Sequence, residues 1–248
     1  MADALDYSHY YREWHDESDD HFQRMAAISL ELLAPYLPSA HDQSVLEIGC
    51  GMGFAIGALG LAGFRSVKGV DIDTSQVDSC KRRGLDVEQI GDLESFLAKH
   101  VGAYSLIVML DVLEHIPVGM QINVLRAIHA ALRPSGRLIM QVPNASSPLA
   151  MRWMYQDFTH ASTFTERSIR FALNNASFSK VNVPATQNRT PRPSLRPWEL
   201  FAKKNRWYVK HWLVRSAWRM VLETELRGDD ISLIPLSLNL MAIADKDG

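Results

Sequence analysis

Short apolar runs alternate with segments of helical periodicity between residues 43 and 143. This alternation predicts a parallel, doubly wound sheet with helices on both faces. Pro117 suits the first turn of the last helix, and Arg133-Pro134-Ser135-Gly136 should end it. The expected strands are Ser44–Ile48, Ser66–Val70, Val87–Ile90, Ser105–Leu110 and Arg137–Val142. The expected helices are Ala55–Ala62, Ser75–Arg83, Leu93–Lys99 and Pro117–Leu132.

Further elements flank this region on both sides. Phe22–Leu33 has the pattern of an amphipathic helix, so residues 1–40 are expected to form an N-terminal helical cap. A helix is expected over Glu166–Ala176, and two more strands over Phe178–Val183 and Ser237–Ala244. The prediction is a Rossmann-like α/β core with a mostly parallel seven-stranded sheet, over 41–184 and 231–248. Within the cap, a lid is expected from Tyr7, Tyr10, Tyr11 and Trp14.

Residues 185–230 interrupt the pattern before the last strand and are expected to form a helical insertion on the substrate side. Ala185–Pro197 is predicted to be a loop, and Trp198–Arg227 a basic and aromatic helical region. Its aromatic and cationic side chains suit an acidic or phosphate-linked glycan near a membrane surface. The alternative is a helix that packs its apolar face on the core. That face would comprise Trp207, Val214, Trp218 and Val221, with Leu222 beside them.

The composition narrows the class of protein. The chain has 248 residues and a net charge of −2, which implies no general affinity for polyanions, so DNA is not expected as a partner and RNA is disfavoured. Its two cysteines, Cys50 and Cys80, form no disulfide framework, which suits the cytoplasm. The first 20 residues resemble no secretory signal, and no apolar run reaches the roughly 18 residues of a membrane span. The pattern indicates no oligomeric state.

The first strand ends in a glycine turn, Val45-Leu46-Glu47-Ile48-Gly49-Cys50-Gly51-Met52-Gly53. Glycines after a strand let the backbone approach a nucleotide, and the following helix offers free N–H groups. The dinucleotide fingerprint GxGxxG fails in both registers, because Phe54 and Ile56 stand where its last glycine would fall. No Gly-Lys-Ser/Thr follows, which excludes a P-loop. The turn could also serve plain strand–helix packing.

Five motifs in order resemble those of the class I S-adenosylmethionine-dependent methyltransferases. They are the glycine turn, Gly69–Asp73, Ile90–Glu94, Tyr104–Pro117 and Leu132–Asn144. The resemblance implies an enzyme that binds S-adenosylmethionine. Glu47 would lie near the methionine amine and Leu110 beside the methionine end, while Asp71 would hold the ribose and Asp92 the adenine. Ile72 and Leu93 complete the implied cofactor set, with Gly49, Gly51 and Gly53 shaping its loop.

Asp111-x-x-Glu114-His115 resembles an acid–histidine element of ubiquinone-biosynthesis O-methyltransferases and of small-RNA 2′-O-methyltransferases. By that resemblance Asp111, Glu114, His115 and His160 would bind a divalent cation such as Mg²⁺, with His160 or His115 as the base. Asp111 is one methylene shorter than the family's glutamate. The alternative is a site without metal, in which Glu114 caps a helix and His115 lines the pocket. Asp157 is expected to orient His160 or to share in catalysis.

The acceptor is predicted from residues 142–183, whose Pro-Asn, Asp-x-Thr-His and Phe-Thr groups resemble methyltransferases of bacterial surface-polysaccharide and O-antigen biosynthesis. The resemblance implies O-methylation of a sugar hydroxyl. Leu110-Asp111-Val112-Leu113 replaces the Asn/Asp-Pro-Pro-Tyr/Phe run of DNA and amide N-methyltransferases, which disfavours that class. A phenol or quinone precursor, an RNA 2′-hydroxyl and a non-catalytic cofactor-binding domain stay open as alternatives. The location expected is cytoplasmic, with a peripheral contact at the inner face of the membrane.

Overall fold

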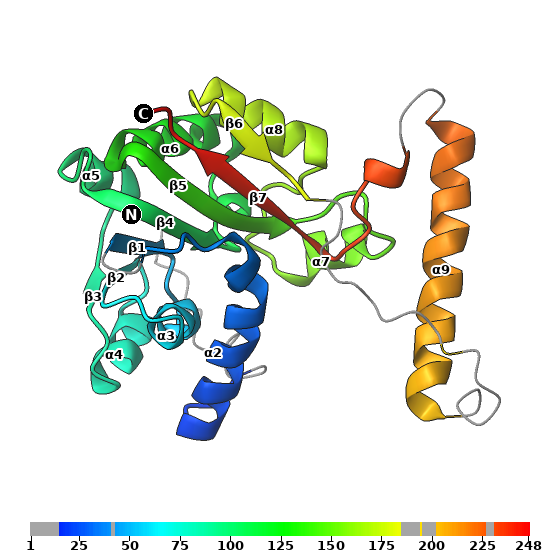
Figure 1. Ribbon diagram of the computed structural model, residues 1–248, viewed down its shortest axis with the longest axis horizontal. Helices are drawn as coiled ribbons and strands as arrows, with labels where there is room; N and C mark the ends of the chain where they lie inside the picture. The colour runs from blue at the N-terminus through cyan, green and yellow to red at the C-terminus, as the bar shows by residue number, and fades with distance from the viewer. Residues whose placement is uncertain (1–14, 41–42, 185–193, 195–201, 227–230) are drawn as a thin grey trace.

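A seven-stranded sheet forms the centre of the computed structural model, which describes residues 15–40, 43–184, 194, 202–226 and 231–248 (Figure 1). The strand order is β3-β2-β1-β4-β5-β7-β6. β7 runs antiparallel to β5 and β6, and the other neighbours pair in parallel, as the sequence predicts. The strands are β1 Ser44–Ile48, β2 Ser66–Asp71, β3 Val87–Gln89, β4 Tyr104–Leu110, β5 Leu132–Pro143, β6 Lys180–Asn182 and β7 Asn239–Asp245.

Helices cover both faces of this sheet, with α6 and α8 on one side and α2 and α3 on the other (Figure 1). The strand periodicity explains the two layers, because Leu46 and Ile107 face the first side while Val45 and Leu106 face the second. The doubly wound α/β prediction is therefore confirmed. The helices are α2 Asp19–Leu33, α3 Phe54–Leu61, α4 Thr74–Arg82, α5 Leu93–Ala98, α6 Val118–Ala131, α7 Ala150–Gln156, α8 Glu166–Asn175 and α9 Lys203–Glu225. The described part of the chain also has 3₁₀ turns at Ala34–Tyr36, Leu113–His115 and Ile231–Leu233.

Some boundaries differ from the expectations. β5 begins at Leu132 rather than Arg137, and its pairing jumps from Tyr104–Leu132 to Leu106–Arg137. The Arg133–Gly136 segment is thus a bulge within the strand, not a separate turn, and Ser135 adopts a φ of 59° there. Pro117 is the N-cap of α6 rather than part of its first turn. The short helix α7 was not predicted from the sequence.

The helix α9 lies between β6 and β7 in the chain and beyond the edge where β5 ends (Figure 1). Trp218 and Leu222 pack against Ile231, Ile234 and Leu236. The alternative in which Trp207, Val214 and Val221 also pack on the core is wrong, since these side chains are 56%, 56% and 47% exposed. Arg219 occupies the inner side instead and donates to the carbonyls of Ile231 and Ile234, at 2.6 and 3.4 Å.

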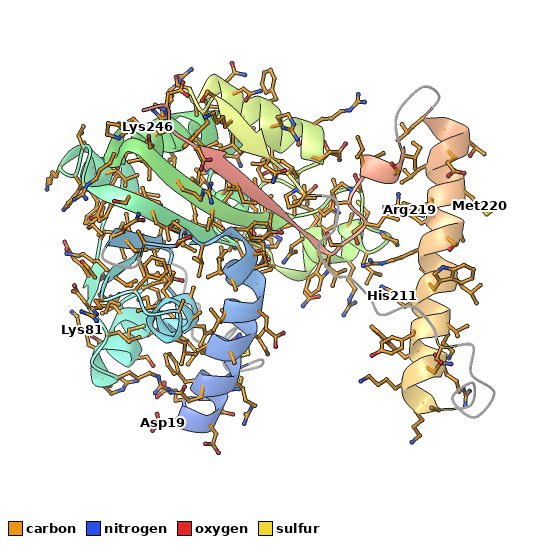
Figure 2. All side chains as sticks on the ribbon, in the orientation of Figure 1. Asp19, Lys81, His211, Arg219, Met220 and Lys246 are labelled. Atoms are coloured by element: carbon orange, nitrogen blue, oxygen red, sulfur yellow. The ribbon has the colours of Figure 1, made fainter. Side chains whose placement is uncertain are left out.

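The side chains in Figure 2 show the same orientation: Arg219 lies on the side of the core, and Met220 on the opposite side of α9. None of the described helices is both long and apolar enough to cross a bilayer. The predicted lid residues Tyr7, Tyr10, Tyr11 and Trp14 lie outside the described residues, as does the loop 185–197 apart from Ser194. The N-terminal helix is present as α2, and the Ser18 hydroxyl caps it by accepting the His21 N–H.

Candidate active site

A cavity of about 400 Å³ lies where β1, β2 and β4 end. The carboxyl ends of parallel strands are the usual ligand site of such sheets, because the loops that follow them meet at one edge. The helix α2 closes one side with Met25, Ile28 and Leu32. The sequence-predicted residues Glu47, Gly49, Gly51, Asp71, Ile72, Leu110, Asp111 and His115 all line this cavity.

The glycine turn has a backbone that only glycine fits. Gly49 has a φ of 68°, and a Cβ built on it would lie 2.4 Å from Val112 Cγ2. Gly53 has a φ of 80°, and its Cβ would lie 2.4 Å from Leu85 Cδ1. Both positions therefore exclude other residues by strain and by contact. Gly53 does not line the cavity but caps the N-terminus of α3.

Asp71, at the end of β2, ties the glycine turn to the next loop. Its carboxylate accepts the Gly51 N–H at 2.8 Å and the Asp73 N–H at 2.9 Å. Burial raises the pKa of Asp71, against which these backbone hydrogen bonds act. Each carboxylate oxygen has two lone pairs, so acceptor capacity is left over for two vicinal hydroxyls in the cavity. Ile72, next to it, is 62% exposed and offers an apolar surface on the cavity wall.

Glu47 is a buried acid on the cavity wall, with 4% of its surface exposed. Its Oε2 has no hydrogen-bond partner among the described residues. Burial is the main cause that raises the pKa of Glu47 well above its usual range. An ammonium group in the cavity would satisfy this oxygen, so the site fits a ligand with an amine at this end.

Asp92 and Leu93 do not line the cavity described here. Asp92 is the N-cap of α5, and its carboxylate accepts the Ser95 N–H at 2.7 Å. Such a cap satisfies a free N–H at the start of the helix and accounts for an aspartate here without a ligand. The adenine contacts expected of Asp92 and Leu93 stay predictions.

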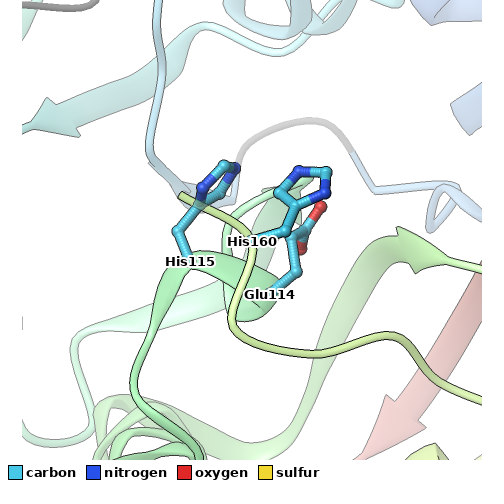
Figure 3. A group of neighbouring side chains, drawn as sticks. All are labelled: Glu114, His115 and His160. Atoms are coloured by element: carbon cyan, nitrogen blue, oxygen red, sulfur yellow. The ribbon is translucent and has the colours of Figure 1, made fainter. Parts of the chain in front are cut away.

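Glu114 and His160 converge on His115 at the wall of the cavity. Their ligand atoms all lie within 4.8 Å of one another. Figure 3 shows the three side chains together, two from the turn after β4 and His160 from the loop after α7. The Ala161 N–H donates to the Glu114 carbonyl at 2.7 Å and joins the two segments. The imidazole centroids of the two histidines are 4.7 Å apart.

Both histidines place Nδ1 within hydrogen-bond distance of an oxygen. His160 Nδ1 is 3.0 Å from the Trp153 carbonyl, and His115 Nδ1 is 2.7 Å from Thr159 Oγ1. Because a carbonyl can only accept, His160 carries a proton on Nδ1. When this ring is neutral, its Nε2 has the lone pair that a base or a metal ligand needs.

Glu114 is fully buried, and neither of its carboxylate oxygens has a hydrogen-bond partner among the described residues. Burial first, and then the charges of Asp111 and Asp157, raise the pKa of Glu114 well above its usual range. Burial and the neighbouring His160 lower the pKa of His115. An orphaned carboxylate beside two imidazoles fits a hard divalent cation or a transferred proton.

Asp111 lines the cavity but does not belong to the three converging ligands. It has a φ of 54°, and its carboxylate accepts Gln141 Nε2–H at 2.7 Å. Asp111 is exposed at the cavity, and partial desolvation by the neighbouring protein, opposed by the Gln141 hydrogen bond, raises its pKa. A positive φ at a non-glycine residue costs free energy, so this conformation of Asp111 indicates that the position of its side chain at the cavity matters for function.

Asp157 does not form the hydrogen bond to His160 that was expected of it. Its Oδ1 accepts the Thr159 N–H at 2.8 Å and the Thr159 hydroxyl at 2.6 Å, while His160 bonds to the Trp153 carbonyl. Sequence reasoning missed Thr159, Gln141 and the Trp153 carbonyl. The Asp-x-Thr spacing of an Asx turn was a usable signal for Thr159, whereas the other two depend on tertiary contacts.

Known proteins resemble this chain in sequence and in fold. A family model described as a methyltransferase domain matches residues 11–183. A ubiquinone biosynthesis O-methyltransferase of Bordetella avium is 28% identical over 141 residues, which are 54% of this chain and 56% of that protein. An Escherichia coli protein of the same name is 26% identical over 126 residues, or 49% of this chain and 51% of that protein. The chain thus spans about half the length of the curated relatives it matches.

Solved structures share the fold at low sequence identity. A SAM-dependent methyltransferase from Archaeoglobus fulgidus superposes with a TM-score of 0.64 and 18% identity, over 89% of this chain and 94% of that chain. A possible histamine N-methyltransferase from Thermotoga maritima gives a TM-score of 0.59 and 15% identity, over 96% and 95%. At these identities the likeness concerns the fold alone.

Proposed function

Because the chain belongs to the class I S-adenosylmethionine-dependent methyltransferases, we propose that it methylates a hydroxyl group, and that Glu114, His115 and His160 activate that hydroxyl. The observation that carries this proposal is the convergence of these three side chains at the wall of the cavity. When bound, S-adenosylmethionine supplies an electrophilic methyl carbon. The protein then has to orient an acceptor oxygen and remove its proton.

The cofactor would bind to residues that line the cavity. Asp71 would accept hydrogen bonds from the ribose hydroxyls, and Glu47 would receive the amine through its orphaned Oε2. The apolar side chains of α2 would pack against the bound cofactor on one side of the cavity.

The histidines would act on the acceptor hydroxyl. His160 Nε2 is the proposed base, because its Nδ1 already donates to the Trp153 carbonyl. In the alternative form of the proposal, Glu114, His115 and His160, with Asp111 nearby, would hold a divalent cation such as Mg²⁺. His160 Nε2 would then bind the ion instead of acting as the base. A cation at this place would bind the acceptor oxygen and lower the pKa of its hydroxyl.

The acceptor we propose is a sugar hydroxyl of a bacterial surface glycan. The support is the basic and aromatic helix α9, which lies beyond the edge of the sheet where β5 ends (Figure 1). A phenol or quinone precursor is the second candidate, and the names of the curated relatives favour it. RNA is disfavoured by the net charge of −2.

A peripheral membrane contact at the inner face of the membrane forms part of the proposal. The outer side of α9 exposes Trp207, Leu213, Val214 and Met220, by 52% to 65%, next to the exposed cation Lys210. Apolar and cationic side chains on one helix are typical of attachment to anionic lipid. Binding to phosphatidylglycerol vesicles that is the same for wild type and Trp207→Ser would count against this contact.

The test of the proposed function is a methyl-transfer screen with labelled S-adenosylmethionine over nucleotide sugars, lipid-linked glycans, phenols and RNA. We expect an O-methyl product from one hydroxyl-bearing class. Removal of metal by a chelator should abolish turnover and Mn²⁺ or Mg²⁺ should restore it. An N-methyl product, or no transfer to any class despite cofactor binding, would overturn the proposal. If the chelated, ion-free protein turns over as fast as the untreated protein, only the metal is excluded from the proposal.

A further inference from the structure

Thr159 lies between an acidic side chain and one of the two histidines of the site. Its hydroxyl oxygen is 2.6 Å from Asp157 Oδ1 and 2.7 Å from His115 Nδ1. Its backbone N–H donates to the same Asp157 oxygen, at 2.8 Å. Asp157 is buried, with 9% of its surface exposed, so this contact is shielded from water. The three groups form a continuous chain of hydrogen bonds that ends on the imidazole.

The protons in this chain follow from the chemistry of each group. A carboxylate oxygen only accepts, and a threonine hydroxyl has a single proton to donate. Because that proton goes to Asp157, the hydroxyl must accept the hydrogen bond from His115, whose Nδ1 therefore carries a proton. In the neutral ring the lone pair is then on Nε2.

A turn formed by Asp157 and Thr159 alone does not explain this arrangement. An Asx turn accounts for both contacts between these neighbours. It does not account for the contact with His115, which comes from the turn after β4, 44 residues earlier in the chain. His160 has its Nδ1–H held by the Trp153 carbonyl, so its tautomer depends on no side chain. Only His115 depends on a hydroxyl.

We propose that Thr159 is a positioning residue that, with Asp157, holds His115 as the Nδ1–H tautomer and makes Nε2 its ligating or basic atom. The proposal rests on the proposed function, because it concerns the Glu114, His115 and His160 cluster. It assigns Asp157 a role through Thr159 and His115 rather than through His160. Supporting hydrogen bonds of this kind typically change metal affinity by about 10- to 100-fold.

The direct test is the tautomer of His115, read from long-range ¹H–¹⁵N correlations of ¹⁵N-histidine-labelled, metal-free protein. His115→Gln assigns the signal. We expect the Nδ1–H tautomer in wild type and in Thr159→Ser, which keeps the hydroxyl. Thr159→Val should lose this preference, while Thr163→Val, in the same segment but outside the chain of hydrogen bonds, should keep it. A His115 signal that stays Nδ1–H in Thr159→Val would overturn the proposal.

Asp157→Leu gives a second test that does not depend on the folding of Thr159→Val. This variant removes the acceptor of the Thr159 hydroxyl proton, which can then go to His115 Nδ1. The His115 tautomer should shift towards Nε2–H, while Asp157→Asn, whose amide oxygen can still accept from the Thr159 N–H and hydroxyl, should keep Nδ1–H. A retained Nδ1–H signal in Asp157→Leu would contradict the proposed chain.

Metal binding supplies a readout that needs no acceptor. Calorimetry with Mn²⁺ should show about 10- to 100-fold weaker binding for Thr159→Val than for Thr159→Ser, with S-adenosylmethionine affinity unchanged. Equal Mn²⁺ affinity of these two variants would overturn the ligand role of Nε2. If wild type binds no Mn²⁺ and transfers no methyl group, the proposed function fails, and the NMR signal still decides the tautomer.

Discussion

At the scale of residues, three glycines of one turn have positive φ values: 68° at Gly49, 50° at Gly51 and 80° at Gly53. This backbone lets Gly51 donate its N–H to Asp71 and so connects the first two strands of the cofactor site. The glycine turn was predicted from its place after the first strand, and the role of Asp71 from the resemblance of Gly69–Asp73 to a methyltransferase motif. Thr159 was not predicted, since its contact with His115 appears only when two distant loops meet.

Gly49→Ala should weaken cofactor binding by at least about tenfold and lower the free energy of unfolding by about 1–3 kcal/mol. The added methyl group would lie 2.4 Å from Val112 Cγ2, and the φ of 68° would be strained. Titration calorimetry with S-adenosylmethionine and thermal unfolding measure the two effects. Gly119→Ala, in α6 with open space around it, is the control and should bind the cofactor as wild type does. Equal affinity of both variants would show that the turn tolerates a side chain.

Glu47→Gln should raise the stability of the cofactor-free protein at neutral pH and weaken S-adenosylmethionine binding about 10- to 100-fold. Burial raises the pKa of Glu47, so the folded state retains a proton that the unfolded chain loses above its own pKa of about 4.3. Wild-type stability therefore falls as the pH rises from that value towards the folded-state pKa, and glutamine removes this loss. The lost binding is that of a charge-assisted hydrogen bond.

Thermal unfolding of wild type and Glu47→Gln between pH 4 and 8 checks this prediction. The gain in Tm should grow with pH and vanish near pH 4. Glu223→Gln, on the exposed side of α9, is the control and should show no such trend. A Glu47→Gln variant that is less stable than wild type at every pH would mean that the carboxylate is charged and paired in the folded protein.

At the scale of elements, the strands and most helices follow from hydrophobic periodicity, because each buries one face in a layered core. For α9, hydrophobic periodicity did not identify the side that packs on the core. Its apolar residues were expected to pack on the core, yet Trp207 and Val214 are both 56% exposed. Periodicity identifies an apolar stripe but not its partner, and here Arg219 forms inward hydrogen bonds to carbonyls instead. The helix α7 was missed because its seven residues are too short to show a period.

Trp218→Ala should loosen α9 without affecting the cofactor cavity. Trp218 donates Nε1–H to the Ser146 carbonyl at 2.9 Å and packs with Leu222 against Ile231 and Ile234. The free energy cost of about 1–3 kcal/mol should appear as faster tryptic cleavage within α9, and the KM for the acceptor should rise while the cofactor Kd stays constant. Trp212→Ala, 55% exposed on the same helix, is the control. Identical cleavage rates in the two variants would contradict this account of α9.

At the scale of the whole molecule, the sheet brings together groups that are far apart in the chain. The cavity collects Glu47 from β1, Asp71 from β2 and Asp111 from the end of β4, and the loop after α7 adds His160. The meeting of Glu47, Asp71 and Asp111 follows from the order of the parallel strands, whereas His160 was expected beside them only from the resemblance to known O-methyltransferases. The hydrogen-bond partners of the two histidines were not predictable from the sequence, because they depend on how the loop after α7 folds back on the turn after β4.

The rate of O-methyl transfer by His160→Ala, compared with wild type at saturating S-adenosylmethionine, tests the central claim most directly. If the converging histidines and Glu114 activate the acceptor hydroxyl, kcat should fall by at least about 100-fold, while the cofactor Kd stays within about twofold. The product should be identified as an O-methyl group by mass spectrometry and NMR. A His160→Ala variant with near-normal kcat, or a wild-type product methylated on nitrogen or carbon, would contradict the account.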